Sequence, residues 1–172
     1  TPGISSAASD VYKRQVTGAE LSLAESVSAD FETQPSYTMI VTAMDSAGNS
    51  TSKELTIYVV DVNESPTDVN LSASTVEEDI AGAQVGTLSA NDPDANDTLS
   101  FSLSGDDADS FEVSEATLKL LDSVSADYAT QSSYAITVVA TDSANNTAQA
   151  DFTISVTETS ALNSIDIDGN KD

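Results

Sequence analysis

The chain repeats itself with a period of 97 residues. Residues 19–59 align without a gap with residues 116–156, and 21 of the 41 aligned positions are identical. The longest identical stretch, Ser-Val-Ser-Ala-Asp, occupies residues 26–30 and again residues 123–127. Such self-similarity indicates two copies of one structural unit.

The first copy lacks its front half, because nothing before Val16 resembles residues 70–114. Residues 10–15, Asp-Val-Tyr-Lys-Arg-Gln, resemble a translated adapter scar and fit neither copy. We therefore predict four segments: a non-native stretch at 1–15, the C-terminal half of a repeat with its linker at 16–63, a complete repeat at 64–159, and an acidic tail at 160–172.

Apolar residues alternate with polar ones in two runs of the complete repeat, which is the period of half-buried strands. The runs are Tyr134–Ala140 and Phe152–Val156. Shorter β-rich stretches occur near Val69 and at 85–88, 99–103, 111–113 and 117–120. About seven short strands separated by Asp, Asn, Gly and Ser predict an all-β fold, a seven-stranded antiparallel Greek-key sandwich of the immunoglobulin-like kind whose apolar positions form the core.

The composition excludes several classes of function. The chain has 29 acidic and 5 basic residues, and its net charge of -24 argues against nucleic-acid binding. Bound cations would offset the repulsion between these negative charges. Cysteine and histidine are both absent, which excludes thiolate and imidazole metal sites and the usual nucleophile–base pairs of enzymes. We therefore expect no catalysis. Calcium takes oxygen ligands, which are abundant here.

No apolar run is long enough to span a membrane, so any membrane tether must lie outside this fragment.

Three motifs together resemble the cadherin family, particularly bacterial cadherin-like repeats. Residues 134–142 are similar to the family strand Y-x-I-x-V-x-A-x-D, residues 90–94 to A-x-D-x-D, and residues 61–66 to the linker D-x-N-D-N-x-P. The resemblance covers roughly residues 19–156. It implies calcium-binding β-sandwich tandem repeats in which each junction holds calcium.

The resemblance places a calcium site at the junction of the two copies. Asp30 and Glu32 match the upstream D-x-E motif. The other expected ligands are the side chains of Asp61, Asn63 and Glu64, the carbonyls of Val62 and Ser65, and the downstream carboxylates of Asp92, Asp94 and Asp142.

Two domains and a linker are needed because calcium takes six to eight oxygens, more than one strand end can present. Without metal, seven carboxylates would converge, and each pair about 6 Å apart would repel by roughly 3 kcal/mol at an effective dielectric near 20. Three ions would bring +6 against the -7 of those side chains. The linker departs from the family form, with Glu64 in place of Asp and one residue fewer. Dispersed surface acids that bind nothing remain the alternative.

The second copy has a weaker set of ligands at its far end. It carries the early Glu78, but the upstream D-x-E motif has become Asp127-Tyr128-Ala129. We expect no full junction site there, as in the last repeat of an array. The tail residues Asp166, Asp168, Asn170 and Asp172 resemble the opening of an EF-hand or dockerin-type calcium loop, with a plain acidic tail as the alternative.

The resulting hypothesis is a calcium-rigidified adhesion or spacer module of a bacterial cell-surface or secreted protein. Its partners would be the neighbouring repeats, and other cell-surface proteins or glycans. Homophilic adhesion belongs to the family resemblance, although the chain has no tryptophan for the exchanged residue of classical cadherins. The alternative is a glycan-binding or accessory module of a secreted polysaccharide-degrading enzyme, which would need exposed aromatic side chains.

Overall fold

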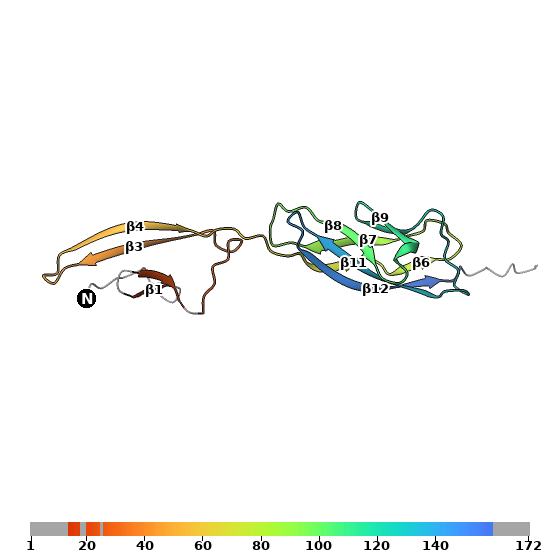
Figure 1. Ribbon diagram of the computed structural model, residues 1–172, viewed down its shortest axis with the longest axis horizontal. Coiled ribbons are helices and arrows are strands. Elements are labelled where there is room, and N and C mark those ends of the chain that lie inside the picture. Colours follow the sequence, from red (N-terminus) through yellow and green to blue (C-terminus); the bar gives the residue numbers. More distant parts are fainter. Residues whose placement is uncertain (1–13, 18–19, 25, 160–172) are drawn as a thin grey trace, which may run out of the picture. The chain divides into compact units, whose positions relative to one another are not determined.

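The computed structural model describes residues 14–17, 20–24 and 26–159 of the chain. The chain divides into two compact units, a first unit at Thr1–Asn63 and a second unit at Glu64–Asp172. Strands make up both units, and the described residues contain a single 3-10 turn and no α-helix (Figure 1). The all-β class expected from the sequence is confirmed.

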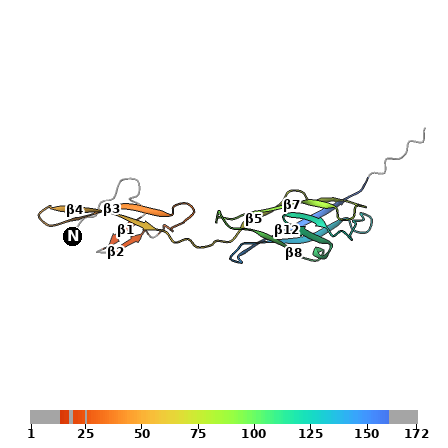
Figure 2. The ribbon, with the colours of Figure 1, turned by 90° about the horizontal axis from the view of Figure 1, so that it is seen from above.

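The second unit is a sandwich of two four-stranded sheets (Figures 1 and 2). One sheet has the order β5-β7-β10-β9 and the other the order β6-β12-β11-β8. The elements are β5 (Thr67–Leu71), β6 (Thr75–Glu77), β7 (Gln84–Asn91), β8 (Ser100–Ser104), η1 (Ala108–Ser110), β9 (Phe111–Ser114), β10 (Thr117–Leu120), β11 (Ser133–Thr141) and β12 (Thr147–Thr157). Each strand expected from the sequence is present.

Strand β6 is an addition to the expected seven. It pairs with β12 in parallel, whereas every other strand pair of the second unit is antiparallel. The chain reaches β6 by crossing from one sheet to the other directly after β5. This crossing passes so close to β7 that a Cβ on Gly86 would lie 2.9 Å from the backbone nitrogen of Ala73, so only glycine fits there.

The core of the second unit lies between the two sheets. Leu118, Leu120, Val138 and Ile154 are fully buried, and they come from strands of both sheets. The rings of Phe111 and Tyr134 meet edge to face, 5.3 Å apart at 88°, which is a favoured aromatic geometry. The alternating residues of β11 and β12 therefore supply one wall of this core, as their sequence period predicts.

The first unit repeats part of this backbone. It contains β1 (Arg14–Thr17), β2 (Glu20–Leu23), β3 (Ser36–Met44) and β4 (Ser50–Tyr58). The β3–β4 pairing starts at Ser36↔Tyr58, and the β11–β12 pairing starts 97 residues later at Ser133↔Ser155. The pairing of β1 with β2 likewise matches that of β9 with β10.

The equivalence between the two copies thus reaches back to Arg14. Arg14 and Gln15 belong to the stretch that the sequence assigns to a non-native segment, and both take part in β1. Residues 1–13, including most of the stretch that resembles an adapter scar, lie outside the described residues, as does the tail from 160 to 172.

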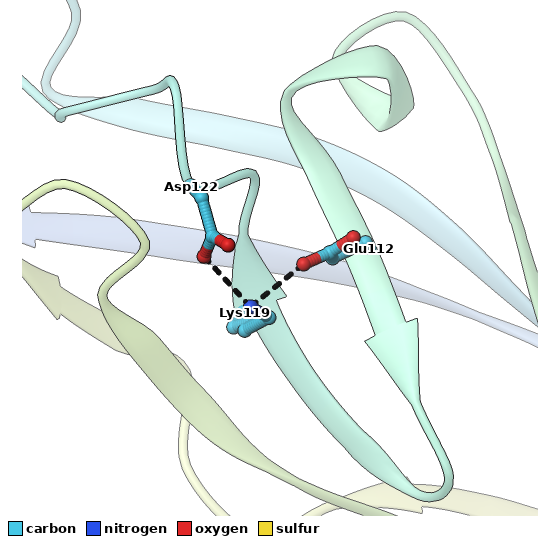
Figure 3. A network of polar contacts seen from close by, with 3 residues as sticks. All are labelled: Glu112, Lys119 and Asp122. Atoms are coloured by element: carbon cyan, nitrogen blue, oxygen red, sulfur yellow. Dashed lines mark hydrogen bonds and ion pairs between the residues drawn. The ribbon is translucent and has the colours of Figure 1, made fainter.

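One lysine bridges two acids on the surface of the second unit. The Nζ of Lys119 on β10 lies 2.7 Å from Glu112 on β9 and 2.8 Å from Asp122, as Figure 3 shows. These carboxylates, Asp122 before Glu112, raise the pKa of Lys119. The pairs are solvent-exposed, so they position the end of β10 more than they stabilise the fold.

Candidate metal centre

Three carboxylates converge at the N-terminal end of the second unit. Asp92 and Asp97 lie in the loop after β7, and Asp142 follows β11 directly. Each offers an oxygen within 4.8 Å of those of the other two. Asp142 is 5% exposed, and the other two are half-buried. Two loops that are distant in sequence therefore bring three negative charges to one partly desolvated point.

Hydrogen bonds from neighbouring residues hold these carboxylates in place. The backbone N–H of Asn146 donates to Oδ1 of Asp142 at 2.7 Å, and its side-chain amide donates to Oδ2 at 2.9 Å. The N–H of Asp94 donates to Oδ1 of Asp92 at 3.0 Å. The N–H of Ser143 donates to Oδ1 of Asp97 at 3.3 Å, which ties the two loops together. The cluster is therefore organised before any ligand arrives.

Asp92 carries the observation that points most directly to a cation. Its Oδ2 atom is buried and has no hydrogen-bond partner. Leaving a charged oxygen in that state is costly unless something compensates it. At an effective dielectric near 20, two carboxylates 4.8 Å apart repel by roughly 3 kcal/mol. The residues fit calcium, since all offer hard oxygen ligands and a divalent ion would relieve both penalties.

Glu64 and Asp94 form a second acidic pair in the same unit. Their carboxylate oxygens lie within 4.8 Å of each other, and the backbone N–H of Glu64 donates to Oδ2 of Asp94 at 2.9 Å. The start of the second unit is thereby fixed to the loop that carries Asp92. Val62 and Ser65 are exposed, and ligation by their carbonyls, like that by Asn63, stays a prediction.

The first unit holds its own acidic pair, because carboxylate oxygens of Glu32 and Asp61 also lie within 4.8 Å of each other. The carboxylate of Asp30 accepts hydrogen bonds from the N–H and the hydroxyl of Thr33, at 2.9 and 2.8 Å. These bonds hold the pKa of Asp30 below its usual range, with the backbone donor contributing most. A lowered pKa favours the ionised form of Asp30.

Asp97 is a functional candidate that the sequence interpretation missed. It stands three residues after Asp94, in the same acidic loop. The sequence feature that could have identified Asp97 is the series of acids at Asp92, Asp94 and Asp97. Only the first two of them match the family motif from which the ligands were predicted. The placement of Asp97 beside Asp142 depends on how the loop folds back, which the local sequence does not specify.

At the far end of the second unit, the two expected acids accept hydrogen bonds from the protein. The carboxylate of Glu78 accepts hydrogen bonds from Tyr128 and Thr159, and that of Asp127 accepts them from Ala129 and Thr130. Among the described residues, no group of three acids that could hold an ion includes either side chain. Asp166, Asp168, Asn170 and Asp172 lie outside the described residues.

Two further findings bear on function. Phe111 and Tyr134 are buried in the core, so they cannot contribute to a sugar-stacking surface. Within residues 14–17, 20–24 and 26–159, no helix is long and apolar enough to cross a bilayer.

The chain resembles known proteins in sequence and in structure. The cadherin-domain family model matches residues 72–157. Mouse cadherin-related family member 2 is 36% identical over 129 residues, which are 67% of this chain and 10% of that protein. Human protocadherin-23 is 31% identical over 138 residues, 74% of this chain and 4% of that protein.

Among solved structures, the PcdhgB3 EC1-4 structure aligns with a TM-score of 0.74 at 21% identity, covering 92% of this chain and 40% of that one. Human protocadherin-24 EC1-2 aligns with a TM-score of 0.70 at 18% identity, covering 92% and 82%. At these identities the structural likeness concerns the fold. The chain spans a tenth or less of the length of the curated relatives it matches.

Proposed function

The chain belongs to the cadherin family, and from that premise we propose that it is an extracellular adhesion and spacer module rigidified by calcium. The metal would bind at the N-terminal end of the second unit, held by Asp92, Asp97 and Asp142. Calcium would supply positive charge and a rigid cross-link there. Like the family, the module is non-enzymatic.

The convergence of these three carboxylates, with Oδ2 of Asp92 buried and without a hydrogen-bond partner, carries the proposal. A solvated acidic surface would point its carboxylates into water, where each finds its own hydrogen bonds. Here Asp142 is buried, and Asp97 is fixed by the N–H of Ser143. The buried Oδ2 of Asp92 therefore favours an inorganic cation as its partner.

We further propose that the first unit and the linker complete the site. Asp61, which pairs with Glu32, stands three residues before Glu64, which pairs with Asp94, so the linker sequence offers both pairs to ions at the junction. Asp30 and the carbonyls of Val62 and Ser65 would add oxygens to reach the coordination number of calcium. A junction bound in this way would resist bending.

The biological role proposed is a rigid segment of a cell-surface or secreted protein that contacts neighbouring repeats and surface partners. Homophilic adhesion and a bacterial source remain proposals, and the matching curated relatives are from mouse and human. Tethering to a membrane would come from parts of the parent protein outside this chain.

Thermal unfolding of the full chain in calcium and in EGTA tests the metal site. Millimolar calcium should raise the melting temperature of the second unit, with a dissociation constant on the order of 10⁻⁴ to 10⁻³ M, as in other extracellular modules. Asp97→Asn should weaken this response because it removes one charged ligand from the cluster.

Asp106→Asn is the matched control, because it removes the same charge from an exposed position away from the three carboxylates. The control should keep the full response to calcium. A melting curve of the wild-type chain that does not depend on calcium would refute the proposal. An equal loss of the calcium response in both variants would show that the response depends on net charge and not on the three carboxylates.

A further inference from the structure

The carboxylate of Glu78 accepts hydrogen bonds from two distant parts of the second unit. The backbone N–H of Tyr128 donates to Oε2 at 3.2 Å. The N–H and the hydroxyl of Thr159 donate to Oε1, at 2.9 and 3.3 Å. Glu78 directly follows β6, Tyr128 lies in the turn before β11, and Thr159 lies two residues beyond β12. One side chain thus joins three segments where the chain leaves the sandwich.

The orientation of these donors opposes a metal ion at Glu78. A carboxylate has about four lone-pair positions, and three donors leave about one. Each N–H also directs the positive end of its dipole at the oxygen, where a cation would have to approach. Oδ2 of Asp92, at the other end of the same unit, is buried without any donor. Both carboxylate oxygens of Glu78 therefore have donors, whereas one oxygen of Asp92 has none.

One expected acid at this end is replaced, and another accepts hydrogen bonds from its own turn. Ala129 occupies the position that corresponds to Glu32 of the first copy. The carboxylate of Asp127 accepts the hydroxyl of Thr130 at 2.6 Å and the N–H of Ala129 at 3.0 Å. The motif therefore supplies one carboxylate fewer here than in the first copy, where Glu32 is present.

We propose that Glu78 is a metal-independent latch that fixes the C-terminal exit of the second unit by hydrogen bonds. It links the residue after β6 to the turn at Tyr128 and to Thr159, and so takes the structural place that a cation would have. Backbone bonds support the same closure, since the N–H of Glu78 donates to the carbonyl of Thr157 at 3.1 Å, and that of Asp79 to the carbonyl of Ala126 at 3.0 Å. Calcium then acts on one end of this unit only.

Amide hydrogen exchange on the full chain, in EGTA and in calcium, tests the latch. In the wild-type chain the amides of Tyr128 and Thr159 should be protected equally in both conditions. Glu78→Ala should accelerate exchange at both amides by about tenfold, the loss expected for one hydrogen bond to a charged acceptor, whether or not calcium is present. Thr159→Ala, which keeps the N–H and removes the hydroxyl, should have a smaller effect confined to residue 159.

Glu77→Ala is the matched control, since Glu77 is an exposed neighbour on β6 and its loss should leave both amides unchanged. Protection of Tyr128 and Thr159 that appears only on adding calcium would make Glu78 a metal ligand and overturn the latch. Unchanged exchange in Glu78→Ala would also overturn it. Neither outcome bears on the response at Asp97, so the latch and the proposed calcium site can fail separately.

Discussion

The β3–β4 and β11–β12 hairpins have the same register, but β4 and the second half of β3 are more exposed than their counterparts. Ile154 on β12 is fully buried, whereas its counterpart Ile57 on β4 is 44% exposed. Leu118 on β10 is also fully buried, and its counterpart Leu21 on β2 is 37% exposed. The hairpin backbone is therefore specified locally by alternation and turn residues, while burial depends on the strands that face it.

The turns that close the two hairpins show how local that specification is. The N–H of Asn49 and that of its counterpart Asn146 donate to the preceding aspartates, Asp45 and Asp142, at 2.9 and 2.7 Å. The left-handed position of each turn is occupied by Gly48 or by Asn145, at φ 89° and 71°, and these residue types tolerate that conformation. Two sequences thus give one turn because each meets the same backbone requirement.

The largest expected effect concerns the core. Ile154→Ala should lower the free energy of unfolding of the second unit by about 2–5 kcal/mol, because it leaves a cavity in a packed interior. Ile57→Ala should cost less than about 1 kcal/mol, because Ile57 is already partly in water. Urea unfolding followed by residue-resolved hydrogen exchange measures both. Equal costs would mean that the β3–β4 hairpin buries its apolar face as fully as β11–β12 does.

Most of the fold could be predicted from the sequence because alternation in β11 and β12 reflects one buried face. Strand β6 escaped prediction because three residues are too few to show a period, and its parallel partner lies far along the chain. The cadherin resemblance is confirmed by the family match, and a bacterial source stays a prediction.

The sequence predicted only those acids of the candidate site that belong to short local motifs. Asp92, Asp94 and Asp142 stand at strand ends, where family patterns place them. The position of Asp97 beside Asp142 depends on a loop that folds back, and the partners of Glu78 include Thr159, 81 residues away. Contacts of that sequence separation are set by the packing of whole sheets, and a single sequence carries little trace of them.

A second contrast separates the acids of the two hairpin turns. Asp142 has Asp92 and Asp97 beside it, whereas among the described residues no group of three acids that could hold an ion includes Asp45. Asp92→Asn should therefore raise the melting temperature of the second unit in EGTA, by relieving repulsion worth roughly 1–3 kcal/mol. The same change should remove most of the gain that calcium gives, so its effect reverses sign between the two conditions.

Asp45→Asn is the matched variant in the first unit. It removes one charge from a single exposed carboxylate, whose pKa is held below its usual range chiefly by the side chain of Asn49. Its effect should be small and should have the same sign with and without calcium. Destabilisation by Asp92→Asn in EGTA would contradict the expected repulsion, and would assign Asp92 a structural role instead.

The smallest expected effect concerns a feature that the two units share. The carboxylates of Asp30 and Asp127 each accept hydrogen bonds from the threonine three residues later, Thr33 or Thr130, and both have a pKa below the ordinary value of 3.8. Because the folded pKa is lowered, the stabilisation is present above pH 3.8 and is lost as the pH falls through the folded value.

The hydrogen-bond donor that lowers the pKa most is different in the two motifs, so substitutions can distinguish them. The Thr130 hydroxyl is the main cause at Asp127, whereas at Asp30 the backbone N–H of Thr33 comes first. Thr130→Val should therefore raise the pKa of Asp127 more than Thr33→Val raises that of Asp30, as measured by carbon-13 titration of the carboxyl groups. Equal shifts would show that the two motifs use the same donor, and a larger shift at Asp30 would reverse the ranking and make its hydroxyl contact the stronger one.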